Sequence, residues 1–386
     1  MSTAFEAEAL ALTDQLVERR RDFHRHPELA YQETRTAGIV ARTLLELGIE
    51  VQTGVGKTGV VGLLEGDHDG PTVLVRADMD ALPILEANNT DYISGEAGKM
   101  HACGHDGHTS IGLAVAQMLS ARRSEMHGRI KFVFQPAEEI GEGARAMVAD
   151  GVLGDPRPDV SLGLHLWNEL PVGLVGVTSG PCMASADIWS CTIRGAGGHG
   201  AAPHLAIDPV AAAAQVITAL QTIVSRNVEP LDSGVVTAGS IHGGEAYNII
   251  PQTVEMKGTL RAFKSETRTL LQRRLVEICQ GVAGALGCTA EVEVRAMTSA
   301  VANDPEVAER RVGAERVRRD VRTMGAEDMS ALMEGVPGCF FFVGSANAAR
   351  ELAYPHHNPR FDFDESALVT AAALMAEAAA SYVIKE

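Results

Sequence analysis

The first part of the chain alternates strand patterns with helix patterns. Short apolar runs rich in Val, Ile and Phe predict strands, and apolar residues that recur every three or four positions predict helices between them. Strands are predicted at 58–66, 73–75, 129–135 and 159–168, and helices at 33–48, 109–123 and 143–151. Gly48 ends the first helix and Pro136 ends the third strand. This alternation predicts a mixed, mostly parallel α/β sheet flanked by helices.

The pattern changes after residue 184 and returns after residue 300. The order strand, helix, strand, strand, helix, strand predicts an α+β, ferredoxin-like domain with its helices on one face of an antiparallel sheet. Its strands are expected at 188–193, 235–241, 253–261 and 290–294, and its helices at 208–224 and 266–286. A strand at 338–344 and a closing helix at 364–383 then resume the first pattern. We therefore expect one domain at 1–184 and 298–386, with a second domain, 185–297, inserted into it.

Composition narrows the class of protein. The 386 residues are 46% hydrophobic, which is enough for two cores, and the net charge of −17 comes with no basic run. Nucleic acid and anionic membranes are therefore not expected partners. The first 29 residues lack the basic and apolar regions of a signal peptide, and the chain has no run of roughly 18 apolar residues that would span a membrane. The six scattered cysteines are expected to be reduced, in a cytoplasmic protein.

Chemically active side chains follow three predicted strands at their ends. Asp78 and Asp80 follow the second strand, Glu138 and Glu139 follow the third, and His165 ends the fourth. In open α/β sheets, ligands bind at the carboxyl ends of parallel strands. The five side chains are therefore expected at one edge of the sheet, as a candidate metal or proton-transfer site.

The segment KMHACGHDGHTS, residues 99–110, concentrates further ligand types. On a turn before a helix that begins near His108, Cys103 and His105 can point the same way, with Asp106 capping the helix or orienting a ligand. A structural zinc finger would need a second Cys/His pair, and none lies nearby. A thiol nucleophile paired with His105 is a third reading, although such close neighbours seldom have the required geometry. His101 and His108 are read as loop and helix-start residues.

Two other segments are ambiguous when each is taken alone. In QPAEE, consecutive side chains diverge, so Glu139 could bind a metal ion while Glu138 holds the attacking water. The simpler reading is an acidic turn before a helix. In YPHHNPRFDFDE, His356 and His357 lie in a loop bracketed by prolines, where solvated histidines are common.

Taken together, these motifs resemble one enzyme family. RADMDALPI, GKMHACGHDGHT, QPAEEIGEGA, GLH, GGHGAAPH, YNIIPQ, GTLR, GAEDM and HHNPRFDFDE occur in the order and spacing of the zinc-dependent N-acyl-amino-acid amidohydrolases, which include hippurate and indole-3-acetyl-amino-acid hydrolases, aminoacylases and carboxypeptidases. The resemblance implies two divalent metal ions, with Glu138 as general base and then acid, and Asp80 near the metals. The implied metal ligands are Cys103 (bridging), His105, Glu139, His165 and His357.

The same resemblance assigns a role to the inserted domain. It implies a lid in which His199 polarises the oxyanion, in its own or a partner subunit, while Asn248 and Arg261 hold the substrate's α-carboxylate. Without it, His199 is a glycine-loop histidine and Arg261 a solvated surface residue. The implied substrate is a small N-acyl amino acid. A homodimer or higher homo-oligomer through the lid is also expected.

Some choices stay open. Many relatives have an apolar residue where this chain has His356, and the spacing to Asn358 favours His357 as the ligand. Zinc suits the ligand set best, yet manganese, cobalt or nickel could bind. The alternatives are a dipeptidase or carboxypeptidase using the same site, a binding protein that has kept the fold, and a Cys103 thiol hydrolase. The segment around Thr58 resembles a phosphate-binding loop but has Val51 where glycine is needed, so a turn is predicted.

Overall fold

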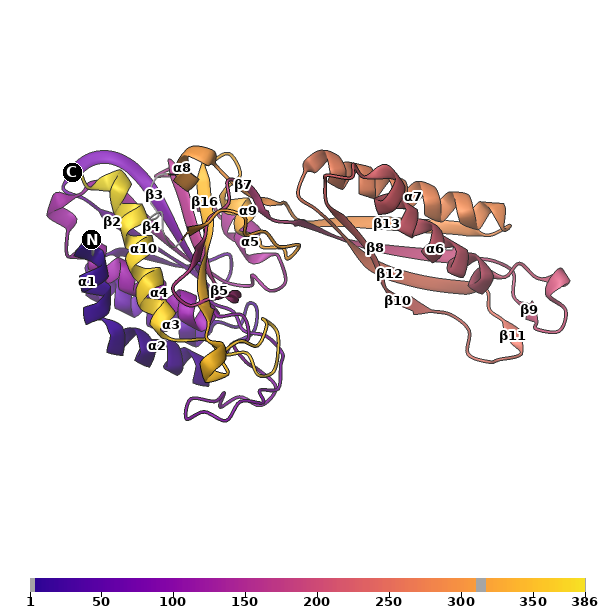
Figure 1. Ribbon diagram of the computed structural model, residues 1–386, viewed down its shortest axis with the longest axis horizontal. Helices are drawn as coiled ribbons and strands as arrows, with labels where there is room; N and C mark the ends of the chain where they lie inside the picture. Colours follow the sequence, from indigo (N-terminus) through magenta and orange to yellow (C-terminus); the bar gives the residue numbers. More distant parts are fainter. Residues whose placement is uncertain (1–3, 310–316, 386) are drawn as a thin grey trace. The chain divides into compact units, whose positions relative to one another are not determined.

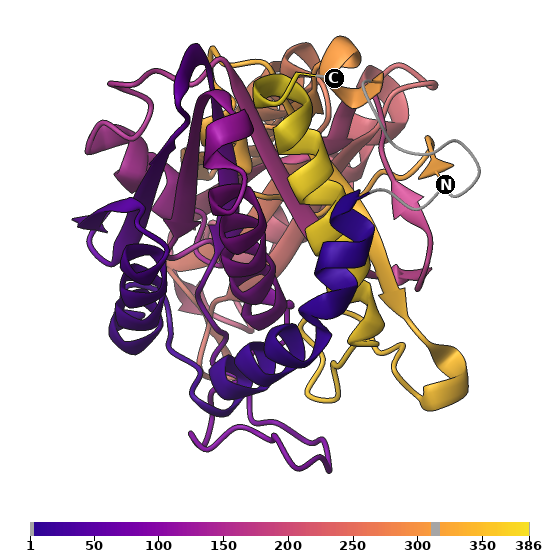
Figure 2. The same ribbon diagram turned by 90° about the vertical axis from the view of Figure 1, so that its left-hand side faces the viewer.

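The computed structural model describes residues 4–309 and 317–385, which form two compact units (Figures 1 and 2). The first unit comprises Met1–Cys182, Val301–Arg322 and Asp328–Glu386, and the second comprises Met183–Ala300 and Thr323–Glu327. The short segment Thr323–Glu327 was assigned to the first domain from sequence. It packs with the second unit because Thr323 bridges to Met183 and the N–H of Ala184 donates to the carbonyl of Gly325.

The first unit is built on one mixed sheet whose centre is parallel, as expected. Strands β4, β3, β5 and β16 run parallel, while β1 and β2 add antiparallel strands at one side and β6 and β15 lie beyond β16. The strands are β1 (Glu50–Val55), β2 (Gly59–Glu65), β3 (His68–Asp78), β4 (His127–Gln135), β5 (Val160–Pro171), β6 (Val175–Gly176), β15 (Val317–Arg318) and β16 (Gly338–Ala346). A small ladder joins β7 (Gly180–Met183) to β14 (Val301–Asn303). The fold class read from the sequence is confirmed.

Helices cover this sheet, and their apolar side chains pack with those of the strands in the hydrophobic core. Figure 1 shows α1 to α4 and α10 on one side and α5 and α9 on the other. The helices are α1 (Ala4–Ala11), α2 (Thr13–Arg25), α3 (Thr34–Glu46), α4 (His105–Ser120), α5 (Gly143–Ala149), α8 (Pro305–Glu309), α9 (Met329–Leu332) and α10 (Ser366–Val383), with 3-10 turns at Arg123–Glu125 and Ala348–Arg350. Helix α4 starts at His105, earlier than the expected start near His108, and Gly104 before it adopts the left-handed conformation (φ 94°).

Helix α10 has a composition that needs a separate reading. Among the described helices it alone has the length and apolar content of a membrane span. Its Ala, Leu and Met side chains, however, pack in the hydrophobic core of the first unit with those of α1 and α4. We therefore read α10 as a core helix.

The second unit is a four-stranded antiparallel sheet in the order β10, β12, β8, β13, which is the ferredoxin-like order. Trp189 lies fully buried beneath the helices. Helix α6 begins at Pro209 because Asp208 accepts hydrogen bonds from the first free backbone amides. The elements are β8 (Ser185–Arg194), β9 (Gly198–His199), α6 (Pro209–Asn227), β10 (Gly234–His242), β11 (Ile249–Ile250), β12 (Thr253–Ala262), α7 (Ser265–Ala285) and β13 (Thr289–Thr298), with a 3-10 turn at Pro203–Leu205.

Candidate metal centre

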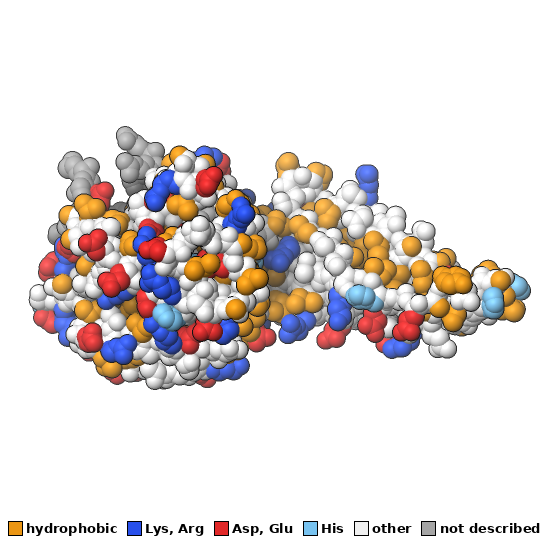
Figure 3. Space-filling model, turned by 90° about the horizontal axis from the view of Figure 1, so that it is seen from below, with side chains coloured by type: hydrophobic (Ala, Val, Ile, Leu, Met, Phe, Trp, Pro, Cys, Tyr) orange, Lys and Arg blue, Asp and Glu red, His pale blue; other side chains and the backbone are white. Residues whose placement is uncertain are grey.

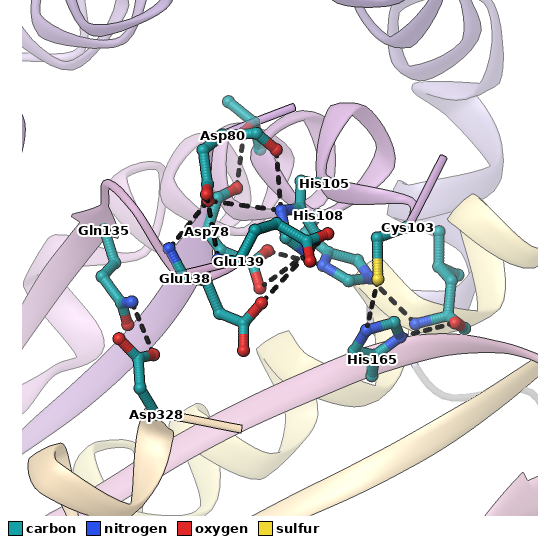
Figure 4. A network of polar contacts seen from close by, with 12 residues as sticks. Asp78, Asp80, Cys103, His105, His108, Gln135, Glu138, Glu139, His165 and Asp328 are labelled. Atoms are coloured by element: carbon teal, nitrogen blue, oxygen red, sulfur yellow. Dashed lines mark hydrogen bonds and ion pairs between the residues drawn. The ribbon is translucent and has the colours of Figure 1, made fainter. Parts of the chain in front are cut away.

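The predicted site residues of the first unit meet at the carboxyl ends of β3, β4 and β5 (Figure 4). Asp78 is the last residue of β3, and Glu138 and Glu139 follow β4 after a turn at Pro136. His165 lies within β5 instead of at its end, because β5 continues along β16 to Pro171. Its ladder with β3 nevertheless stops at Leu162, so His165 lies just past the last β3 pairing.

The five side chains expected to bind metal come together. The donor atoms of Cys103, His105 and His165 all lie within 4.8 Å of one another, and so do those of Cys103, Glu139 and His357. The Cys103 sulfur is 3.5 Å from His165 Nε2, and His357 Nε2 is 3.2 Å from Glu139 Oε2. Two groups of three ligands therefore share one thiol. Each group could hold a divalent metal ion, and Cys103 belongs to both groups.

Two buried atoms at this site test whether a cation fits. Among the described residues, His105 Nε2 and Glu139 Oε1 are buried and make no hydrogen bond, although they lie 3.9 Å apart. Leaving a buried polar atom unsatisfied costs about 1–3 kcal/mol. A divalent cation would coordinate both atoms, so the residues present fit a metal ion.

Electrostatics point the same way. Burial alone would lower the pKa of His105, but the carboxylates of Asp78, Asp80 and Glu139 outweigh it and raise this pKa to about 10. The site thus carries enough negative charge to hold a cation in place of that proton. Burial lowers the pKa of His165 well below its usual value, which keeps its imidazole in the neutral form that a metal ligand needs.

Asp80 organises the site through its carboxylate and its carbonyl. The carboxylate oxygens accept the backbone N–H groups of Glu138 (2.9 Å) and Glu139 (3.0 Å). Its backbone oxygen lies 2.8 Å from His105 Nδ1, which directs His105 Nε2 toward the carboxylates. Glu138 Oε2 lies 3.9 Å from His105 Nε2. Asp80 therefore touches a predicted ligand and the predicted general base from the same position.

The two adjacent histidines of the last loop have different surroundings. His356 Nε2 lies 3.0 Å from the carbonyl of Leu166, and its ring stacks on Trp167 at 4.7 Å between centroids. His357 instead directs Nε2 to Glu139. His356 is thus engaged by backbone and aromatic contacts, and His357 is left to face the ligand group.

His108 does more than start a helix, which is how it was read from the sequence. Its Nδ1 lies 2.6 Å from Asp78 Oδ1, and its Nε2 accepts the N–H of Leu166 at 2.9 Å. It therefore ties β3 to β5 beside the predicted ligands. His101 is fully buried in a neighbouring position and forms no such link.

Asp106 is the centre of a buried charge network that the sequence analysis missed. It accepts the N–H of Gly107, as a residue at a helix start can, and also pairs with Arg20 Nε (2.9 Å) and His24 Nδ1 (2.7 Å) from α2. Arg20 reaches Asp362 as well, at 2.7 Å. The network connects α2 to the first turn of α4, which carries His105, and to the loop that carries His357. One signal was available: in α2, Arg20 shares the apolar face, at helical spacing, with residues 16 and 23.

The predicted substrate-binding residues of the second unit fall at two places. His199 pairs with Ile249 in the β9–β11 ladder, and the carbonyl of Asn248 accepts the N–H of Gly200 at 2.8 Å, so His199 and Asn248 are neighbours. Arg261 lies near the far end of β12, where it donates to the carbonyl of Met324. Eight residues of extended strand, roughly 26 Å, separate Arg261 from the start of β12 beside that ladder. Within one unit, Arg261 and Asn248 therefore do not meet.

Comparisons with known proteins give matches over most of the chain. A model of peptidase family M20/M25/M40 matches residues 74–381. The N-acetylcysteine deacetylase of Bacillus subtilis is 40% identical over 376 residues, covering 96% of this chain and 97% of that protein. An IAA-amino acid hydrolase of Arabidopsis thaliana is 38% identical over 383 residues, covering 96% and 86%. The crystal structure of a dinuclear metal binding M20 peptidase of Bacillus subtilis has a TM-score of 0.83 at 37% identity, covering 96% and 98%.

Proposed function

The chain belongs to peptidase family M20/M25/M40 and is a metal-dependent hydrolase of carbon–nitrogen bonds; on this premise we propose that it cleaves N-acyl amino acids to a carboxylic acid and a free amino acid. One observation carries the proposal. Glu138 lies beside a convergent set of side chains that could hold a metal ion, and its backbone N–H, like that of Glu139, donates to Asp80. The relatives named above act on N-acetylcysteine and on IAA-amino acids. Both kinds of substrate are amino acids that carry an acyl group, and the acyl groups differ.

The proposed chemistry would be shared between two metal ions and the side chains of the protein. Two divalent metal ions would supply Lewis acidity and lower the pKa of a bound water. We assign their ligands as Cys103, His105, Glu139, His165 and His357. Glu138 takes the proton of the attacking water and later delivers it to the leaving amine. Asp80 keeps Glu138 in reach of the ligand group through the backbone bond.

The second unit supplies the substrate contacts in this proposal. His199 stabilises the oxyanion, and Asn248 and Arg261 bind the α-carboxylate as a lid closes. Because Asn248 lies before the start of β12 and Arg261 lies near its end, one carboxylate reaches both of them only if a second subunit contributes one of the two. The proposal is therefore a homodimer, with His199 and Asn248 acting together on the partner's substrate.

Exposed apolar side chains on the second unit support such an assembly. Ile249 and Tyr247 are largely exposed beside His199, and Leu205 is 77% exposed. Apolar side chains are frequent across the face of this unit seen in Figure 3. Contiguous exposed apolar surface marks association sites. Light scattering that shows a monomer at the working concentration would count against the dimer.

We place this activity in the cytoplasm. None of the six cysteines forms a disulfide and all six are buried, as expected where thiols stay reduced. Detection of the protein in an extracellular or periplasmic fraction would contradict this placement.

The test is a hydrolysis screen. Acetyl, benzoyl, indole-acetyl and succinyl amino acids are offered beside dipeptides, with zinc, manganese, cobalt or nickel, and metal content is measured in parallel. Turnover of acyl amino acids with two metals per chain is expected, and preference for dipeptides would indicate a peptidase. Metal binding without turnover favours a binding protein.

Full activity of Glu138→Ala with metal bound would refute the mechanism. Inactivation by thiol alkylation together with indifference to chelators would favour a Cys103 nucleophile.

A further inference from the structure

The turn that carries the two glutamates is held by carboxylates from distant segments. Residues 137–139 present three consecutive backbone N–H groups. Those of Glu138 and Glu139 bind Asp80, and the N–H of Ala137 donates to Glu33 Oε1 at 2.9 Å. Ala137 has a φ of 54°, in the left-handed region that residues with a side chain rarely adopt. Such a conformation persists only where the surroundings fix it.

Glu33 holds this turn although it occupies the N-cap of another element. It precedes α3, but its side chain makes no hydrogen bond to that helix. Glu28 does that work: its two carboxylate oxygens accept the N–H groups of Arg35 (2.9 Å) and Thr36 (2.8 Å). The Glu33 carboxylate is thereby left to act outside α3.

The same carboxylate is fully buried and fixed from two further sides. Glu33 Oε1 also accepts the N–H of Tyr31 at 3.0 Å, and Thr58 donates its hydroxyl to Glu33 Oε2 at 2.5 Å. Thr58 belongs to the turn that resembled a phosphate-binding loop. Through Thr58, that turn helps to hold the Glu33 carboxylate in place.

We propose that Glu33, supported by Thr58, is a positioning residue that sets the direction of Glu138 and Glu139. The backbone angles of Ala137 set how the chain turns from β4 into residues 138 and 139. Holding Ala137 in its left-handed conformation therefore sets the direction in which those two side chains leave the turn. Without Glu33, Ala137 relaxes toward ordinary backbone angles, and Glu139 moves away from His357. The inference rests on the roles proposed above for Glu138 and Glu139.

The test measures metal affinity separately from stability. Metal-free protein is titrated with Zn²⁺ and with Mn²⁺ by calorimetry, and kcat and KM follow for a substrate found in the screen. Glu33→Ala should weaken metal binding by about 10- to 100-fold and lower kcat more than it raises KM. Glu33→Gln should restore both, because its Oε1 accepts the same two N–H groups and its Nε2 can donate to the Thr58 hydroxyl.

Glu28→Ala is the matched control, because Glu28 supports the start of α3 without touching the turn. It should lower the melting temperature of the metal-free protein and leave metal affinity unchanged. Thr58→Val should lower metal affinity in the same direction as Glu33→Ala but by less, and it decides the question if Glu33→Ala does not fold.

Any of three results would overturn the inference: unchanged metal affinity in Glu33→Ala, unchanged metal affinity in Thr58→Val, or an equal loss of affinity in Glu28→Ala. The inference and the proposed function can also fail separately. Metal affinity that depends on Glu33, in a protein that turns over none of the offered amides, would reject the function and keep the positioning role.

Discussion

Arg20 allows a test of how the segments that carry His105 and His357 are held in place. Its side chain is fully buried in α2 and pairs at 2.9 Å with Asp106, at 2.7 Å with Asp362 and at 3.2 Å with Glu365. The guanidinium also lies against the ring of Phe363, 4.3 Å from its centroid. Arg20→Met keeps most of the side-chain volume and removes the charge. The substitution leaves two buried carboxylates without their shared cation.

The expected loss of stability follows from this burial. Removing one partner of a buried ion pair costs about 3–5 kcal/mol, because the charge left behind stays desolvated. Asp106 keeps the N–H of Gly107 and the ring of His24, so a value inside that range is expected and not a larger one. For a unit of this size, the melting temperature should fall by roughly 6–20 °C.

Arg21 provides the control on the same helix. Its side chain is 32% exposed, and it pairs with Glu365 at 2.7 Å. A partly exposed pair of this kind contributes about 0–1 kcal/mol. Arg21→Met should therefore be nearly neutral. The contrast between the two variants isolates burial, since both remove one arginine from α2.

The assay is urea unfolding of the metal-free protein, followed by tryptophan fluorescence. The chain has two tryptophans, Trp167 in the first unit and Trp189 in the second, so a Trp189→Phe background makes the signal report the first unit. An Arg20→Met variant within about 1 kcal/mol of its parent, in the range of an exposed pair, would refute the reasoning. Equal losses in the two arginine variants would refute it as well.

Three further predictions concern the metal centre and its supporting loops. His356→Leu should keep two metal ions per chain and His357→Ala should keep one, measured by elemental analysis, because only His357 faces Glu139. Chelation with EDTA should abolish hydrolysis and lower the calorimetric melting temperature of the first unit, and added metal should restore both. Burial alone would raise the pKa of Asp364, but hydrogen bonds from Asn347 and from residue 366 outweigh it and hold that pKa below its usual value. The stabilisation by this carboxylate is therefore complete above its unfolded pKa of about 3.9 and is lost as the pH falls through the lower folded value, so the deficit of Asp364→Ala in urea unfolding should shrink in acid.

The site residues that follow the ends of strands could be predicted from the sequence. Asp80, Glu138 and Glu139 follow strands whose apolar runs are unmistakable, and parallel strands bring their carboxyl ends to one edge. His165 was found by the same rule although β5 continues past it. His357 has no such local signal, because it follows no strand directly. Its loop was noticed in the sequence, but only the family resemblance marked His357 as a ligand.

The supporting contacts escaped because they join segments far apart in the chain. Arg20 lies 86 residues from Asp106 and 342 from Asp362, and no local period encodes such pairs. Glu33 was equally hidden, since a glutamate at the start of a helix looks like a routine partner of the helix dipole. What the sequence does record is the anomaly of an arginine on an apolar helix face. Such a residue needs a buried partner, even when the partner cannot be named.

The turns of this site share one backbone feature, a residue in the left-handed conformation. Gly104, Ala137 and His357 all have positive φ, at 94°, 54° and 64°, and each lies at or beside a predicted ligand or the general base. Two of the three are not glycine, so their conformations cost energy that other contacts must offset. The N–H of Ala137 binds Glu33, and the N–H of His357 donates to the carbonyl of Ala102 at 2.8 Å. The second of these bonds joins two ligand loops directly. A metal centre assembled from turns thus depends on cross-links between turns, which is why its support lies in residues that no helix or strand pattern selects.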